Sequence, residues 1–117
     1  MIDFSHNEIS LIQKSYDLYK AIYQLVKKFP KSDKYNLGNE LKNLNLQIIE
    51  LLIEAESAQK DWKAPLVEKA SAKLGLLKIF IRLASDLKII DQKNYLNIQE
   101  QLQEIGRMLG GWLKSLK

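Results

Sequence analysis

Several stretches of this sequence carry two apolar stripes at helical spacing, although a helix in a small bundle needs only one. Read at about 100° per residue, the segment 66–87 has a first stripe and, far around the same helix, a second. The first comprises Leu66, Ala70, Leu74, Leu77, Ile81 and Ala84, and the second comprises Ala72, Leu76, Ile79 and Leu83. A helix buries one such stripe against its own core. Contact between subunits is the simplest use for the second.

The same doubling recurs in two of the other segments with helical spacing. The first stripes are Ile12, Tyr16, Tyr19, Tyr23 and Val26; then Leu37, Leu41, Leu44, Ile48, Leu51 and Ala55; and, near the end of the chain, Tyr95, Ile98, Leu102, Ile105, Leu109, Trp112 and Leu116. The second stripes are Leu18, Ile22, Leu25 and Phe29, and Leu46, Ile49 and Ile53. We expect the first stripes, tyrosines included, to form the core and the second to support a homo-oligomer. The competing interpretation is a thicker core with oversized faces.

Local signals divide the chain into four helices. Ser5 and Glu8 have the spacing of a capping box. Pro30 ends the first helix because a residue before proline is pushed out of the α region, and Ser32 and Asp91 are candidate N-caps. Short connections favour antiparallel neighbours. The sequence therefore predicts one domain over 1–117, an all-α, antiparallel up-down four-helix bundle with helices at about 7–29, 33–58, 62–88 and 92–114.

The composition is that of an ordinary water-soluble domain. Hydrophobic residues make up 46% of the chain and charged residues 27%. The chain has no cysteine, which excludes disulfides and thiolate metal sites. Its first residues lack the basic and apolar regions of a signal peptide, and no apolar run approaches the roughly 20 residues of a membrane helix. We therefore expect a cytoplasmic protein that has no membrane partner.

Positive charge is concentrated in the third predicted helix. The chain carries a formal charge of +4, and residues 60–90 alone carry +4 whereas residues 33–59 carry −3. An anionic partner such as RNA or DNA is one interpretation, and a soluble lysine-rich surface is the other. The candidate phosphate-contacting residues are Lys73, Lys78, Arg82, Lys88 and Arg107. A second lysine group, Lys27, Lys28, Lys31 and Lys34, lies at the first helix connection.

Residue patterns that would support catalysis are missing from the sequence. The single histidine, His6, stands near the N-terminus, with no partner for nucleophilic catalysis. The Glu-x-x-His pairs of bundle metal sites do not occur. Gly110-Gly111 is not followed by the lysine and hydroxyl residue of a phosphate-binding loop. We expect a non-enzymatic protein without metal or other cofactor.

Motifs in the second half of the chain resemble those of the Avd family, the accessory variability determinants of diversity-generating retroelements. The stretch IRLASDLKIIDQKNYLNIQEQLQEIGRMLGGWLKSL (81–116) contains R-L-A-x-D-L, then Y-L, then I-G-R-M-L-G-G-W-L-K. Upstream, Tyr16-Asp17-Leu18-Tyr19 and Phe29-Pro30-Lys31 before Leu37-Gly38 are also similar. These upstream features recur in the broader group of four-helix-bundle proteins encoded in ribosomal RNA intervening sequences.

The resemblance implies a four-helix bundle that assembles as a pentameric ring. It further implies a basic surface that binds nucleic acid, template RNA or cDNA, and a partner reverse transcriptase whose mutagenic copying the protein supports. This chain departs from the pattern in having only two arginines, Arg82 and Arg107. A lysine in place of an arginine offers a compact point charge instead of a planar guanidinium that can form two parallel hydrogen bonds.

We therefore expect an accessory protein of a diversity-generating retroelement. Its subunit interface would use Leu46, Ile49, Ile53, Leu76, Ile79 and Leu83. The alternative is an interaction module encoded in a ribosomal RNA intervening sequence, with no retroelement role. A neighbouring reverse-transcriptase gene with a variable repeat would favour the first hypothesis over the second.

Overall fold

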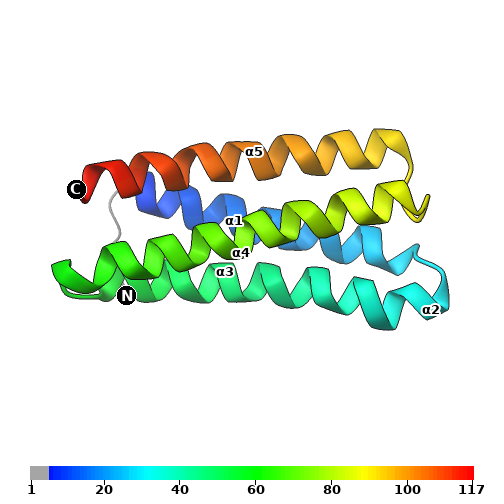
Figure 1. Ribbon diagram of the computed structural model, residues 1–117, viewed down its shortest axis with the longest axis horizontal. Coiled ribbons are helices and arrows are strands. Elements are labelled where there is room, and N and C mark those ends of the chain that lie inside the picture. The colour runs from blue at the N-terminus through cyan, green and yellow to red at the C-terminus, as the bar shows by residue number, and fades with distance from the viewer. Residues whose placement is uncertain (1–5) are drawn as a thin grey trace.

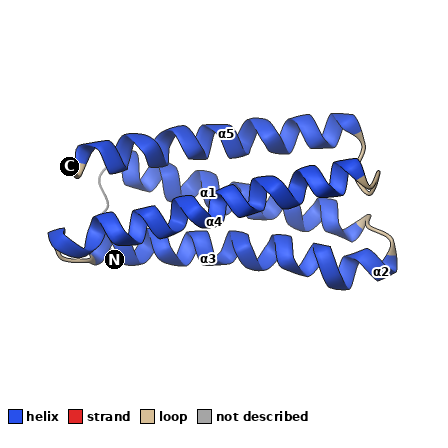
Figure 2. Ribbon diagram, in the orientation of Figure 1, coloured by secondary structure: helices blue, strands red, loops and turns tan. Residues whose placement is uncertain are grey.

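The structure is a computed structural model that describes residues 6–117, with side chains described from residue 10 onward. The described part of the chain is all-helical, which confirms the predicted helical bundle. Its four long helices are α1 (His6–Lys27), α3 (Asn39–Ser57), α4 (Lys60–Asp86) and α5 (Gln92–Ser115). They form an elongated antiparallel bundle of 43 × 24 × 21 Å (Figures 1 and 2). The capping box predicted at Ser5 and Glu8, and the side chain of His6, lie outside the described residues.

Each long helix packs against two others, in the cyclic order α1, α3, α4, α5. The buried side chains that fill the centre are almost all aliphatic, and on α3, α4 and α5 they largely follow the first stripes seen in the sequence. Several positions differ: Val67 is fully buried where Leu66 was expected, and the partly buried positions of the first stripes are Leu37, Leu66, Tyr95, Trp112 and Leu116. These three helices therefore bury one stripe each and leave the second stripes of α3 and α4 uncovered.

In helix α1 the second stripe is buried together with Val26 of the first, whereas the tyrosines of the first stripe are not in the core. Leu18, Ile22 and Leu25 are buried, whereas Tyr16 and Tyr23 are 54% and 42% exposed. The expectation that the tyrosines form the core was wrong. Both stripes have helical spacing, but a buried tyrosine hydroxyl needs a hydrogen-bond partner, whereas leucine and isoleucine need none. The aliphatic stripe therefore takes the core, and the tyrosine hydroxyls stay near water.

The connection between α1 and α3 is helical rather than a loop capped by Ser32. Helix α2 (Lys31–Asp33) and the π-helical segment η1 (Lys34–Gly38) lead directly into α3. Pro30 occupies the N-cap position, and its carbonyl accepts from the N–H groups of Asp33 and Lys34 at 3.0 and 2.9 Å. The predicted Ser32 N-cap is thus wrong, because Pro30 takes the N-cap position and the helix begins at Lys31, two residues earlier than predicted.

The wide π turn brings the start of α3 close to α1 at Gly38. A Cβ at this position would lie 2.6 Å from Cγ1 of Val26, a distance that side chains do not tolerate. Gly38 has no positive φ. Glycine at this position therefore serves the close approach of two helices rather than a special backbone conformation.

Two further helix ends are held by side chains. Lys63 of α4 donates from Nζ to the carbonyl oxygens of Ala55 and Glu56, at 2.9 and 2.7 Å. These carbonyls lie in the last turn of α3, where the N–H of Ala58 also donates to Ala55 at 3.3 Å, and Lys63 adds a charged donor that caps the C-terminus of α3. Asp91 accepts from the N–H of Asn94 at 2.8 Å, which confirms the predicted N-cap of α5. Helix α5 then continues through Gly110 and Gly111 to Ser115.

Candidate nucleic-acid and assembly surfaces

Two of the predicted phosphate-contacting residues, Lys78 and Arg82, lie together on the α5 side of α4. They are four residues apart and share one face of the helix. The amine of Lys78 reaches α5, where it lies 3.1 Å from the position that a Cβ would take at Gly106. Glycine at 106 therefore leaves room for this amine between the helices. In the described part of the chain neither residue forms an ion pair, so both charges are available to an anion.

Arg107 is the predicted cation of α5, and it lies beside Glu104, which pairs with α1. Its exposed guanidinium donates to Glu104, whose carboxylate also pairs with Lys14 of α1 at 3.8 Å. A phosphate at Arg107 would compete with this carboxylate for the guanidinium. Lys78 and Arg82 are therefore the better-placed pair.

The structure places the other two predicted cations elsewhere. Lys73 is five residues before Lys78, a separation that puts it far around α4, on the side toward α3. Lys88 lies in the turn that follows α4, one residue beyond its C-cap. The five predicted residues thus do not form one patch: Lys78 and Arg82 share the α4–α5 side, and Arg107, Lys73 and Lys88 stand apart.

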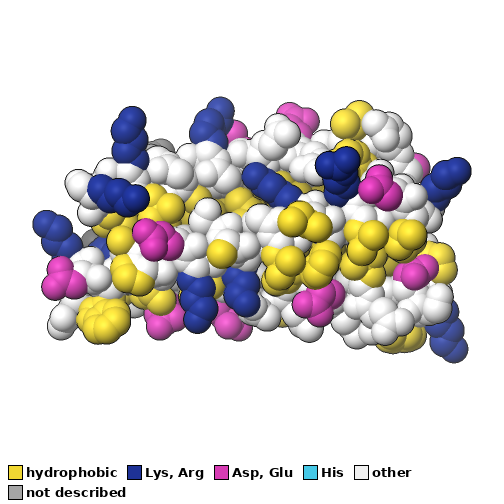
Figure 3. Space-filling model, in the orientation of Figure 1, with side chains coloured by type: hydrophobic (Ala, Val, Ile, Leu, Met, Phe, Trp, Pro, Cys, Tyr) yellow, Lys and Arg dark blue, Asp and Glu magenta, His cyan; other side chains and the backbone are white. Residues whose placement is uncertain are grey.

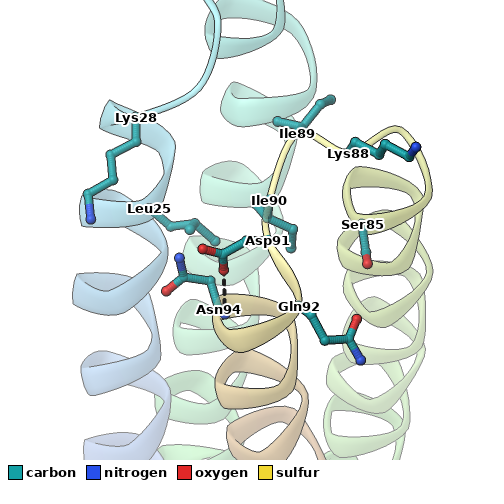
Figure 4. A pocket seen from close by; sticks show the side chains of 9 residues that line it. All are labelled: Leu25, Lys28, Ser85, Lys88, Ile89, Ile90, Asp91, Gln92 and Asn94. Carbon is teal, nitrogen blue, oxygen red and sulfur yellow. Dashed lines mark hydrogen bonds between the residues drawn. The ribbon is translucent and has the colours of Figure 1, made fainter.

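Lys88 has a backbone role that the sequence did not reveal. Its φ is 62°, and it donates from its N–H to Ser85, while the N–H of Ile89 donates to Ala84, both at 2.9 Å. These bonds are those of a Schellman helix end. Figure 4 shows the adjacent pocket of about 560 Å³, in which the amines of Lys28 and Lys88 diverge. The pocket therefore does not offer a converging pair of cations.

The exposed apolar residues of α4 form a continuous row, which we call the α4 face: Leu76, Ile79, Leu83 and Leu87. Ile79 and Leu87 are about three-fifths exposed, at 63% and 59%. Figure 3 shows hydrophobic side chains gathered along α4 toward its C-terminal half, with basic side chains on the α5 flank and both acidic and basic side chains on the α3 flank. These residues include three that the sequence assigned to a subunit interface, Leu76, Ile79 and Leu83.

The other three predicted interface residues, Leu46, Ile49 and Ile53, lie on a second surface with the α1 tyrosines. We call this the α1–α3 face: Tyr16, Tyr19, Tyr23, Leu46, Ile49 and Ile53. The amine of Lys42 on α3 lies 5.7 Å from the centroid of the Tyr23 ring on α1, which shows that the two helices contribute to one surface. Lys20 and Lys27 lie 5.0 and 4.8 Å from the Tyr16 and Tyr23 ring centroids.

Charged residues separate the two faces. On α3, Glu50 and Glu54 follow Leu46 by four and eight residues, and this spacing turns them progressively away from α1. On α4, Lys69 and Lys73 lie on the side toward α3. Figure 3 shows this band of acidic and basic side chains between α4 and α3. The predicted interface set is therefore divided between two faces rather than gathered into one.

The tyrosine part of the α1–α3 face was not predicted, although the sequence held a signal for it. Tyr16 and Lys20, and Tyr23 and Lys27, are spaced by four residues and so lie on the same side of α1. A lysine that repeats beside each tyrosine marks a side of the helix that water reaches. That spacing could have identified the exposed stripe.

The described residues contain no group of three or more histidine, cysteine, aspartate or glutamate side chains placed to hold a metal ion. None of the described helices combines the length and the hydropathy that a membrane span requires. The described surface carries unpaired cations and exposed apolar side chains. Such groups can bind an anion or another protein surface.

Comparison with known proteins places the chain in a family. The sequence model of the bAvd-like family matches residues 9–116, which is nearly the whole chain. No curated protein matches it. The family match agrees with the Avd resemblance seen in the C-terminal motifs, and this family is accessory and non-catalytic. The chain therefore belongs to the bAvd-like family.

Proposed function

We propose that this protein is a cytoplasmic accessory protein of a diversity-generating retroelement. It holds template RNA or cDNA together with the reverse transcriptase of the same element, and so supports mutagenic copying. The protein acts as a homo-oligomeric ring, for which the family resemblance implies five copies. The observation that carries nucleic-acid binding is the pair of unpaired cations, Lys78 and Arg82, on one side of α4.

Two adjacent cations that no carboxylate of the described residues occupies suit contact with the phosphates of nucleic acid. Phosphate groups bind such pairs through charge and release counterions, which makes binding depend strongly on salt. Arg107, Lys73 and Lys88 contribute further contacts, and repeating the set around a ring multiplies them without new chemistry.

A salt titration of binding to a single-stranded RNA tests this assignment. The double variant Lys78→Gln/Arg82→Gln should bind more weakly than the parent protein. Its plot of log affinity against log salt should be shallower by about 1 to 2 units, since each lost phosphate contact removes roughly 0.7 to 0.9 from the slope. Filter binding at several salt concentrations measures both quantities.

The matched control removes the same charge from exposed positions at the ends of the bundle, in Lys60→Gln/Lys117→Gln. This control should keep the parent slope. Equal slopes in the two double variants would show that net charge alone drives binding, and the assignment to α4 would then be wrong. Absence of salt-dependent binding in the parent protein would remove the nucleic-acid proposal altogether.

Binding to the reverse transcriptase is tested separately by co-purification. A reverse transcriptase of the same element should be retained by the tagged protein after nuclease treatment, whereas a reverse transcriptase from an unrelated element should not. Retention that disappears with nuclease would mean that RNA bridges the two proteins. A failure of retention under all conditions would contradict the partner assignment while leaving nucleic-acid binding intact.

A further inference from the structure

We infer that Gly106 of α5 is a positioning residue for the proposed phosphate contact. The space left by its missing side chain, which we call the Gly106 notch, holds the amine of Lys78 in place between α4 and α5. This inference rests on the proposed nucleic-acid function and deepens it. It gives the two cations of α4 different roles, with a held ammonium at Lys78 and an exposed guanidinium at Arg82.

The end of the Lys78 side chain lies directly at the glycine. A Cβ at position 106 would lie 3.1 Å from Nζ of Lys78 and 3.9 Å from its Cε. The nitrogen is nearer than the carbon that carries it, so the ammonium group itself occupies the notch. Lys78 and Gly106 are both partly buried, whereas a lysine such as Lys60 is exposed. The amine of Lys78 is therefore confined between two helices.

Close packing of the two helix backbones does not explain the glycine. The three atoms nearest to the Cβ position are Nζ and Cε of Lys78 and, at 3.4 Å, Cδ2 of Leu74, and all three belong to side chains. At Gly38, by contrast, a Cβ would lie only 2.6 Å from a methyl group of Val26. The missing side chain at 106 therefore secures the place of an amine rather than the distance between helices.

Helix formation does not explain the glycine either. Glycine is the poorest helix former after proline, yet Gly106 lies inside α5 and its φ is not positive. Alanine would suit this backbone better. At Gly110, one turn further along the same helix, a Cβ would have no atom within 4 Å. The two positions therefore form a matched pair that differs in the presence of the Lys78 amine.

A held amine suits the binding of a phosphate group. Within the described residues, the amine of Lys78 forms neither a hydrogen bond nor an ion pair. A side chain that is already confined loses less conformational entropy when it binds an anion. The guanidinium of Arg82, one turn along α4, can add charge-assisted hydrogen bonds to the same phosphate. Gly106 thus promotes binding through Lys78 without touching the nucleic acid.

Substitutions of two sizes at Gly106 test the inference. Gly106→Ala requires the amine to shift slightly, whereas Gly106→Leu fills the notch and displaces it. We expect Gly106→Leu to weaken binding to a single-stranded RNA by about three- to tenfold, because the displaced amine loses part of a charge-assisted hydrogen bond. Gly106→Ala should have a smaller effect in the same direction. Filter binding measures the affinities.

Stability and a matched position provide the controls. Gly106→Ala should resist thermal unfolding at least as well as the parent protein, since alanine favours the helix. Weaker RNA binding by a protein that is no less stable separates positioning from damage to the fold. Gly110→Ala and Gly110→Leu make the same changes where space is open, and they should bind RNA like the parent. Where Gly106→Leu fails to fold, Gly106→Ala carries the comparison.

Two further measurements show whether Gly106 acts through Lys78. In a Lys78→Gln background, Gly106→Leu should not weaken RNA binding further, because the amine is already absent. In the free protein with carbon-13-labelled lysine, the methylene group beside the Lys78 amine should move more slowly than that of exposed Lys60 by nuclear magnetic resonance. Gly106→Leu should remove this difference. The second measurement requires no RNA.

Three results would overturn the inference: parent affinity in the Gly106 variants, an equal loss of affinity with and without the Lys78 amine, or a Lys78 signal as mobile as that of Lys60 in the parent protein. A failure of the proposed function looks different. In that case Lys78→Gln/Arg82→Gln binds RNA like the parent protein, while the resonance measurement still detects a held amine.

Discussion

At the residue scale, Gly38 shows how one missing side chain sets the distance between two helices. A new Cβ at this position would lie 2.6 Å from Cγ1 of Val26. We predict that Gly38→Ala destabilises the protein by about 1–3 kcal/mol, the usual cost of overpacking a core. Valine is branched at Cβ and cannot move its methyl group aside easily. Urea denaturation followed by circular dichroism measures the free energy of unfolding.

Two controls separate this clash from ordinary helix propensity. At Gly111, which is also helical, no atom lies within 4 Å of a new Cβ. Gly111→Ala should therefore be neutral or stabilising by up to about 1 kcal/mol. In a Val26→Ala background, Gly38→Ala should cost much less than it does in the parent protein. An unchanged cost in that background would mean that Val26 is not the obstacle.

The sequence could place Gly38 in a helical region but could not identify what lies opposite it. Helical spacing describes one helix at a time, whereas the contact between Gly38 and Val26 depends on how two helices pack. The same holds for Asn45, which is fully buried and donates to the carbonyl of Ser15 on α1 at 3.0 Å. Its position in the sequence gives no sign of that partner.

At the element scale, Lys63 joins α3 to α4 through the carbonyls of Ala55 and Glu56 at the end of α3. In Lys63→Met these two oxygens lose a charged donor, while the length of the side chain is kept. We predict that this change lowers the free energy of unfolding by on the order of 1 kcal/mol. Thermal unfolding of the variant measures the loss. Lys60→Met, which changes an exposed lysine of the same turn, should have little effect, and equal losses in both would contradict the capping role.

The elements themselves could largely be predicted from the sequence, because spacing and caps are local properties. Asp91 shows this well, since its cap depends only on the next three residues. The two stripes of α1 could not be told apart from local spacing alone. Choosing between Leu18 and Tyr16 for the core depends on whether a hydroxyl can find a partner in the assembled bundle, which spacing does not describe.

At the scale of the whole molecule, the sequence could indicate surplus apolar residues but not their arrangement. Leu46 and Ile79 belong to stripes that look equivalent when each helix is read alone. Only the cyclic order of the helices, and the charged band of Glu50, Glu54, Lys69 and Lys73, place them on different faces. The arrangement of the candidate cations was equally hidden in the sequence. Lys73 and Lys78 are only five residues apart, yet they lie on opposite flanks of α4.

Assembly and nucleic-acid binding should be coupled through the number of cations that one particle presents. We predict that Leu46→Glu, which puts a charge on a predicted interface residue, yields a monomer that binds single-stranded RNA at least about tenfold more weakly than the parent protein. Its salt dependence should be shallower, because a single copy neutralises fewer phosphates. Leu46 lies away from Lys78 and Arg82, so the new carboxylate does not repel RNA at the proposed contacts. Gln24→Glu, which adds the same charge to α1, should bind RNA like the parent protein, and a monomer with the parent affinity and slope would show that one bundle is sufficient.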